Sequence, residues 1–318
     1  MIFRFFLLFS LFWVSLAAEM LMRTKVALGT FVSISADERY KKDVETAFGI
    51  IEDVEASLSS YRINSPISKL NEDKYAVLDA LSYEALLLSQ NYYHKTQGYF
   101  DITVGSITKD LYRFGADERL ASERELQNAT VAFHTLFFDK TQAKLQQNAK
   151  IDLGGMGKGF AVDKVAAFLK MQKIKDANIA ASGDIRCLHK CKIDIQDPFS
   201  DGVLLSLETL EPDTAITTSG NYNRYVQNKS NNHLIDPKIK KSQQAFASIT
   251  LISHLPSSDI DAYATAASVM PPQKAYAFLD TLPLAYIIIE TDTEYVESKN
   301  LFLYIKKMDD LEKTGVLK

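Results

Sequence analysis

The residues best suited to chemistry lie in a glycine-rich segment in the middle of the chain. Residues 151–159 read Ile-Asp-Leu-Gly-Gly-Met-Gly-Lys-Gly, which places four glycines within six residues, beside Asp152 and Lys158. Glycine lets a backbone approach a ligand closely. Apolar residues at helical spacing follow from Val162 to Leu169, so the segment predicts a bend that leads into a helix. Unpaired N–H groups at a helix start, with a lysine beside them, suit a phosphate.

This glycine-rich segment matches neither of the common nucleotide-binding glycine motifs. The Walker A pattern G-x-x-x-x-G-K-[ST] and the dinucleotide pattern G-x-G-x-x-G are both absent from it. A tight strand-to-helix turn that binds nothing has the same composition. The glycines alone therefore leave phosphate binding and a plain turn both open.

A second candidate site lies near the C-terminal end of the sequence. Asp261 and Thr265 are four residues apart in a segment that predicts a helix continuing to Met270, so their side chains share one helix face. Carboxylate and hydroxyl oxygens suit a hard cation such as Mg²⁺. An aspartate in the first turn of a helix also stabilises the helix dipole without any metal, and the residues alone do not decide between these roles.

Helices and strands alternate along the chain that must position these residues. Residues 43–59 carry an amphipathic pattern and residues 82–96 predict a second helix. Residues 25–35 alternate apolar and polar side chains like one strand, and residues 284–290 and 301–305 predict two strands near the C-terminus. No internal repeat or low-complexity linker separates them. We expect one two-lobed unit spanning residues 19–318.

Length and composition limit the class of protein. The chain has 318 residues, of which 47% are hydrophobic, enough to bury a large core. The formal net charge is −4, so no basic footprint for nucleic acid is expected. No apolar stretch of about 20 residues follows the N-terminal segment, so we expect the mature protein not to cross a membrane.

The N-terminus has the layout of an export signal. Arg4 precedes an apolar stretch from Phe5 to Leu16, and the small residues Ala17 and Ala18 follow. We expect residues 1–18 to be a cleaved signal peptide and the mature protein to lie in the periplasm. An uncleaved N-terminal anchor is the alternative, although the segment is short for a membrane span. No cysteine follows the apolar stretch directly, so a lipoprotein anchor is not expected.

The sequence contains two cysteines, Cys187 and Cys191, between two strand-like runs. In an oxidising compartment they suit a disulfide across a hairpin. A metal site that also uses His189 is the alternative, but three ligands on one tight turn lack a fourth.

The order of motifs along the chain points to a family. The glycine-rich segment resembles the signature D-L-G-G-x-x-K-G-x-x-x-D of the ApbE family, the FAD:protein FMN transferases. Seven other segments resemble motifs of that family in the same order: residues 28–30, 58–71, 98–105, 178–186, 215–222, 233–237 and 259–266. Three departures occur: Leu28 replaces a methionine, Ser182 replaces a glycine, and Lys238-Ile239 replaces the threonine and glycine that follow Pro237.

This resemblance implies a fold and a set of roles. The fold would be α+β, with antiparallel sheets and helices packed against them. A Mg²⁺ ion would be held by Asp261, Thr265 and the backbone carbonyl of Gly155, and Asp261 would thereby be catalytic. His233 is the candidate general base, since it is the histidine inside a matched motif. The residues implied for FAD binding are Leu28, Tyr61, Tyr99, Phe100, Asp101, Asp152, Lys158 and Ile235.

The resemblance also implies a reaction. FAD would be cleaved at its diphosphate and the FMN half transferred to a threonine hydroxyl of an acceptor flavoprotein, with AMP released. The acceptors implied are membrane-associated electron-transfer subunits exposed outside the cytoplasm. Two alternatives use the same cavity: an FAD pyrophosphatase that releases free FMN and AMP, and a flavin-binding protein without catalytic activity.

Overall fold

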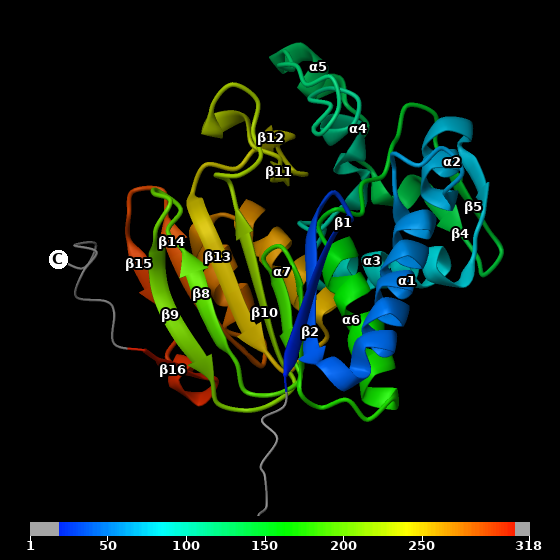
Figure 1. Cartoon of the computed structure of the whole chain (residues 1–318). Helices are drawn as coiled ribbons and strands as arrows, with labels where there is room; N and C mark the ends of the chain where they lie inside the picture. Colours follow the sequence, from blue (N-terminus) through cyan, green and yellow to red (C-terminus); the bar gives the residue numbers. More distant parts are fainter. Residues whose placement is uncertain (1–18, 309–318) are drawn as a thin grey trace, which may run out of the picture.

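The fold is built on one antiparallel sheet of eight strands, in the order β1-β2-β6-β7-β10-β13-β14-β15 (Figure 1). The computed structural model describes residues 19–308, so the predicted signal peptide at residues 1–18 lies outside the described part. The strands of this sheet are β1 (Met20–Ala27), β2 (Thr30–Asp37), β6 (Ala177–Ala181), β7 (Asp184–Cys187), β10 (Thr214–Gly220), β13 (Phe246–Ser253), β14 (Leu284–Glu290) and β15 (Tyr295–Glu297).

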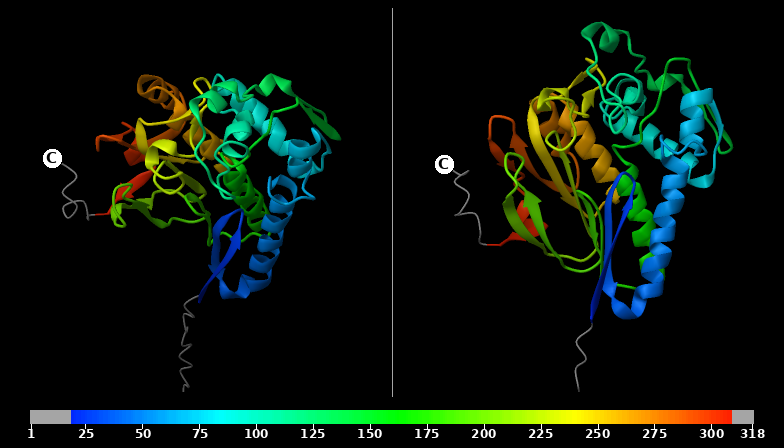
Figure 2. Two further views of the ribbon diagram at one scale, coloured as in Figure 1. Left: turned by 90° about the horizontal axis from the view of Figure 1, so that it is seen from above. Right: turned by 45° about the horizontal axis from the view of Figure 1, so that its top comes forward.

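Helices cover one face of this sheet, here called the back face, along its whole width. The covering helices are α1 (Lys41–Leu58), α6 (Gly157–Met171) and α7 (Ser257–Val269), and α8 (Pro272–Leu279) follows α7. Figure 2 shows α1 and α6 running side by side next to β1 and β2. Alternate strand residues such as Ile34, Ile179 and Leu251 point into this helical layer and are fully buried.

A second, smaller sheet covers only part of the opposite face, here called the front face. Its order is β16-β9-β8, with β8 (Lys192–Gln196), β9 (Val203–Thr209) and β16 (Ile305–Lys307). Ile195 and Leu205 of this sheet pack in one cluster with Ile216, Ile252 and Ile287 of the large sheet. The front face of β1 and β2 lies outside that cluster.

A lobe of shorter elements caps one end of the sheet. It contains α2 (Pro66–Asp73), α3 (Ala80–Lys95), α4 (Gly105–Thr108), α5 (Glu123–Asn128), a sheet of β3 (Tyr75–Val77), β5 (Gln142–Leu145) and β4 (Leu136–Phe138), and the pair β11 (Ile235–Asp236) and β12 (Lys241–Ser242). Short 3₁₀ turns occur at residues 38–40, 102–104, 133–135, 229–231 and 301–303. The mixture of antiparallel sheets and separate helices confirms the α+β prediction.

Two local predictions were wrong. Residues 25–35 form a hairpin and not one strand, because Leu28 and Gly29 both adopt positive φ angles, 55° and 70°, and reverse the chain between β1 and β2. The predicted strand at residues 301–305 is a 3₁₀ turn that leads into β16. The apolar residues there were read as a strand, but they pack as a turn at the edge of the small sheet.

The two cysteines are joined in a disulfide that links the end of β7 to the start of β8. Both are buried in the front cluster. Because disulfide sulfurs are not thiolates, the alternative Cys-His-Cys metal site is excluded. Within residues 19–308, no helix combines the length and apolar character that crossing a membrane requires.

Candidate functional site

A cavity of about 490 Å³ opens at the end of the large sheet nearest the short-element lobe. Every site residue expected from the sequence lines it, except Tyr61. The lining set therefore includes Leu28, Tyr99, Phe100, Asp101, Asp152, Gly155, Lys158, His233, Ile235, Asp261 and Thr265. The structure thus brings together side chains that come from most of the length of the chain.

The floor of the cavity is held by two helices that cap each other. The Oδ2 atom of Asp261, on α7, accepts the N–H of Gly159 at the start of α6, at 3.1 Å. Asp163, on α6, accepts the N–H groups of Ser257 and Ser258 at the start of α7, at 2.7 and 2.9 Å. Each carboxylate satisfies N–H groups that a helix start leaves unpaired. This reciprocal capping fixes the glycine-rich bend against α7.

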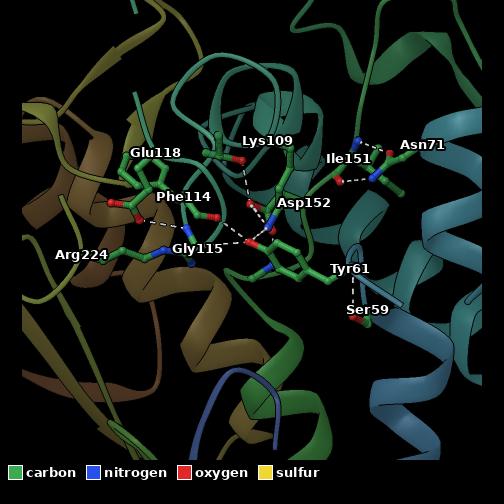
Figure 3. Close-up of polar contacts among 12 residues, drawn as sticks. Ser59, Tyr61, Asn71, Lys109, Phe114, Gly115, Glu118, Ile151, Asp152 and Arg224 are labelled. Carbon is green, nitrogen blue, oxygen red and sulfur yellow. Dashed lines mark hydrogen bonds and ion pairs between the residues drawn. The ribbon is translucent and has the colours of Figure 1, made fainter. Parts of the chain in front are cut away.

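The two helices also approach each other closely at Gly159. A Cβ atom at this position would lie 2.4 Å from the carbonyl oxygen of Ser257. Glycine is therefore required for the contact that lets the reciprocal caps form. On the other side of the bend, the side-chain amide of Asn71 bonds both the N–H and the carbonyl of Ile151, at 2.7 and 2.9 Å (Figure 3). These contacts fix the chain on both sides of the bend.

A buried charge group lies beside the bend. The Nζ atom of Lys158 is 3.0 Å from Asp184 and 3.5 Å from Asp261, whose side chains are almost fully buried. Burial, and then repulsion from Asp184, raise the pKa of Asp261 to about 7, while Lys158 opposes that rise. The two carboxylates next to Lys158 raise its own pKa in spite of burial. With both carboxylates ionised the group carries one net negative charge, which favours a further cation.

The oxygen atoms around Asp261 suit such a cation. The hydroxyl of Thr265, one helical turn after Asp261, lies 3.2 Å from the carbonyl oxygen of Gly155. A Cβ at residue 155 would lie 2.9 Å from the Thr265 side chain, so glycine admits this approach. Carboxylate, hydroxyl and carbonyl oxygens form the donor set that Mg²⁺ prefers. The residues present therefore fit a hard divalent cation.

Asp152 is held ionised at the mouth of the bend. Its Oδ2 atom accepts from the Thr108 hydroxyl at 2.7 Å and lies 3.4 Å from the Nζ of Lys109, and its Oδ1 accepts the N–H of Gly154 at 3.0 Å. Burial alone would raise its pKa, but Lys109 and Arg224 outweigh burial and lower the pKa to about 2. Asp152 is therefore a permanent acceptor, suited to a hydroxyl or amino group of a nucleotide and not to proton transfer.

His233 is positioned as a neutral imidazole. Its Nδ1 atom lies 3.1 Å from the carbonyl oxygen of Arg224, which can only accept, so Nδ1 carries the proton and Nε2 keeps a free lone pair. Burial, together with the charge of Arg224, lowers its pKa to about 4. This pKa lies well below the ordinary histidine value near 6.5, because the ring is enclosed beside a guanidinium.

Tyr61 lies outside the cavity lining and is 55% exposed. Figure 3 shows its hydroxyl directed at the neighbourhood of Phe114 and Lys109. The hydroxyl donates to the carbonyl of Phe114 at 2.6 Å, and the Nζ of Lys109 lies 2.8 Å from it and 4.1 Å from the ring centre. Lys109 also contacts Asp152. Tyr61 therefore helps to position Lys109 beside Asp152 and does not itself line the cavity. A stacking role on the flavin stays a prediction.

The loop before α4, which contains Tyr99, Phe100 and Asp101, forms a further wall of the cavity. Asp101 is buried and accepts from the N–H and hydroxyl of Thr103, at 2.8 and 2.6 Å, so it begins the 3₁₀ turn at residues 102–104. Burial raises its pKa. Phe100 packs edge-to-face on Tyr92, and two lysines, Lys238 and Lys274, lie 5.4 and 4.7 Å from the Tyr99 ring centre. Lys238 belongs to the departure after Pro237, so that departure places a cation at the cavity edge.

Three features of the site were missed from the sequence. Asp184 lies in the matched motif at residues 178–186, directly after Gly183. Its place in that motif is the sequence feature that could have marked it as a site residue. Lys109 and Arg224 set the charge on Asp152, but nothing in their local sequence marks them. Four consecutive residues of β8, Ile193 to Gln196, also line the cavity, and only tertiary packing brings them there.

The fold resembles that of solved ApbE proteins. The ApbE protein of Thermotoga maritima aligns with a TM-score of 0.82 and 22% identity, over 90% of this chain and 99% of that one. The flavin transferase ApbE of Vibrio cholerae aligns with a TM-score of 0.79 and 22% identity, over 91% of this chain and all of that one. At this level of identity the likeness establishes the fold.

Sequence comparison establishes the family. The ApbE family model matches residues 28–288, so the chain belongs to the ApbE family. A relative from Vibrio cholerae named FAD:protein FMN transferase is 28% identical over 269 residues, which cover 78% of this chain and 79% of that protein. A relative of the same name from Haemophilus influenzae is 27% identical, over 83% and 82% of the two chains. The family resemblance inferred from the motifs is confirmed.

Proposed function

We propose that this chain is an FAD:protein FMN transferase that uses Mg²⁺ and attaches FMN to a threonine of an acceptor flavoprotein. The observation that carries the proposal is the buried Lys158–Asp184–Asp261 group at the start of α6. Two of its members, Lys158 and Asp261, line the same cavity as the residues expected for FAD. Membership of a family whose relatives bear that name supports the same activity.

The proposed reaction exchanges one phosphorus–oxygen bond for another, and groups that line the cavity stabilise the charge on the diphosphate. The threonine oxygen forms a bond to the phosphorus of the FMN half, the bond from that phosphorus to the bridging oxygen breaks, and AMP leaves with the bridging oxygen. A Mg²⁺ ion held by Asp261, Thr265 and the carbonyl of Gly155 would neutralise charge on the diphosphate. The charge of Lys158 and the positive end of the α6 dipole stabilise the same charge.

His233 supplies a place for the proton. Its free Nε2 lone pair accepts the proton that the threonine hydroxyl loses, since the ring is neutral at any pH well above 4. Asp152 stays ionised throughout and orients the nucleotide. The remaining predicted contacts, Leu28 and Ile235 among them, provide apolar surface for the ring systems.

The test is incubation of the protein with FAD, MgCl₂ and a purified acceptor domain, followed by mass spectrometry. Transfer adds the mass of FMN less one water to a single threonine of the acceptor and releases one AMP per adduct. Free FMN that appears equally fast with and without acceptor would indicate the pyrophosphatase. Tight FAD binding that is unchanged by a chelator, without any AMP, would indicate a flavin-binding protein.

The proposal extends to the location of the protein. An export signal at residues 1–18 supports work in the periplasm, where a membrane-associated electron-transfer subunit is a suitable acceptor. Cell fractionation with N-terminal sequencing tests this part: a periplasmic protein that starts near residue 19 is expected. Recovery of an unprocessed chain in the membrane fraction would indicate an N-terminal anchor instead.

A further inference from the structure

None of the expected FAD-binding residues lies on β7, β10 or β8, although residues of all three strands line the cavity. The short-element lobe and the glycine-rich bend supply nearly all of those residues, and the β1–β2 turn adds Leu28. The wall formed by β8 contributes residues 193–196 to the cavity lining and none to that set. Successive residues of a strand point to opposite faces, so four consecutive lining residues mean that the cavity runs along the edge of β8 and not along one face.

This edge of β8 carries unpaired backbone groups. β8 is the last strand of its sheet, and within residues 19–308 no strand pairs with its outer side. On the inner side, Thr209 donates its N–H to the carbonyl of Cys191 at 3.0 Å, and Asp197 donates to the carbonyl of Gly202 at 3.0 Å. Bonding residues alternate along an antiparallel pair. The N–H and carbonyl of Asp194 therefore point away from β9, along the cavity.

The same cavity also reaches the β1–β2 hairpin, whose front face is uncovered. Cross-strand pairs place Val26 opposite Phe31, and both point to the front. Their side chains are 75% and 68% exposed, and Met22 on the same face of β1 is 72% exposed. The turn between β1 and β2, residues 28–30, lines the cavity. The cavity is therefore lined both by β8 and by the β1–β2 turn, and the exposed apolar pair Val26 and Phe31 lies directly beyond that turn.

The geometry points to the occupant. We propose, on the basis of the transferase function above, that an extended segment of the acceptor protein pairs with the outer edge of β8 and lies over Phe31 and Val26. A threonine oxygen is close to its own backbone, so that backbone must enter the cavity to reach the diphosphate. A helix with side chains is about 10–12 Å wide, whereas an added strand needs about 4.8 Å beside its neighbour. An extended chain therefore needs less room beside β8 than a helix does.

The main test compares two exposed phenylalanines on different sheets. Phe31→Asp places a charge on the front face, and Phe137→Asp places the same charge on β4, in the separate three-stranded sheet of the short-element lobe. The two side chains are 68% and 69% exposed, so neither variant should unfold. We expect Phe31→Asp to raise the KM for the acceptor about tenfold, which is about 1.4 kcal/mol, and Phe137→Asp to leave it unchanged. Neither residue lines the cavity, so FAD binding should match wild type in both.

A second pair of variants tests the strand edge. Asp194→Pro removes an N–H that points away from β9, so it spares the β8–β9 pairing but blocks a bond to an added strand. Asp194→Ala removes the side chain and its bond from the Ser206 hydroxyl but keeps the N–H. We expect the proline variant to raise the acceptor KM at least fivefold above that of the alanine variant.

The outcomes separate the two proposals. If the wild-type protein gives no adduct with any acceptor, the proposed function fails. If wild type transfers FMN while Phe31→Asp matches Phe137→Asp and Asp194→Pro matches Asp194→Ala, the function stands and the docking proposal is overturned.

Discussion

The two faces of the large sheet differ in how they are covered, and the difference separates chemistry from recognition. On the back face, α1, α6 and α7 bury every strand from β2 to β14, and the charged group of Lys158, Asp184 and Asp261 lies at the end of this layer. On the front face, the small sheet covers the half of the large sheet from β7 to β15 but leaves the β1–β2 hairpin open. Reacting groups need a fixed, desolvated setting, whereas a protein substrate needs an accessible surface.

The largest expected effect comes from removing the charge that the back layer buries. Asp261→Asn keeps the shape of the side chain but removes the anionic ligand, so FMN transfer should fall at least about a hundredfold. The measurement is the rate of adduct formation at saturating FAD and MgCl₂.

The control is on the same helix. Asp259→Asn leaves an oxygen that can still accept from the Tyr92 hydroxyl, and Asp259 does not line the cavity. Its rate should stay within about threefold of wild type. Flavin attachment at full speed by Asp261→Asn would refute the role of the buried charge.

The next effect concerns the close contact of α6 and α7. Gly159→Ala inserts a methyl group 2.4 Å from the Ser257 carbonyl, a backbone atom that cannot move away freely. Overpacking of this kind costs about 1–3 kcal/mol. We expect the free energy of unfolding, measured with urea, to fall by an amount near the upper end of this range. Gly157→Ala is the matched control, because nothing lies within 4 Å of its added Cβ. That variant should be slightly more stable, and equal losses in both would contradict the close-contact argument.

The front layer should respond more weakly. Replacing Cys187 and Cys191 together by alanine removes a cross-link between residues four apart. Loop-closure entropy for so short a loop predicts a loss of about 2 kcal/mol in unfolding free energy. Because the disulfide joins β7 to β8, the acceptor KM should change more than FAD binding does. Calorimetry measures the unfolding free energy, and titration with the acceptor measures the KM. An unchanged unfolding free energy would show that the disulfide does not stabilise the protein.

The effect that is smallest at neutral pH is a dependence of stability on pH. The pKa of His233 is about 4 in the folded protein and about 6.5 in an unfolded chain. The unfolded chain therefore binds a proton that the folded chain does not bind, so stability falls as pH decreases from about 6.5 to 4. One such proton gives a slope of at most about 1.4 kcal/mol per pH unit. His233→Gln should reduce the slope by about that amount, and identical slopes would place the buried neutral histidine in doubt.

Much of this arrangement was predictable from the sequence, for identifiable reasons. The helix at residues 41–58 follows from its amphipathic spacing, and the start of α2 at Ser65-Pro66 follows from capping chemistry. Both signals are local in the sequence. The glycine-rich bend and the Asp261 helix were found because glycines and a helical i, i+4 pair mark them. Membership of the family was predictable because the motifs occur in a fixed order.

The remainder depends on contacts between distant segments. The alternation of residues 25–35 looks like one strand, because the turn uses Leu28, a residue without the usual turn signature, in a left-handed conformation. The charge around Asp152 comes from Lys109 and Arg224, which are far from it in sequence. The role of β8 depends on which strand edge remains open, and that is a property of the assembled sheets.

The exchange of caps between α6 and α7 has a consequence for how the protein opens. Because Asp163 holds the first amides of α7 and Asp261 holds an amide of α6, neither helix start can fray while the other stays formed. The amide hydrogens of Gly159, Ser257 and Ser258 should then exchange with solvent deuterium together, at the rate of global unfolding. Breathing motions that admit substrates must instead belong to the hairpin and the lobe of short helices.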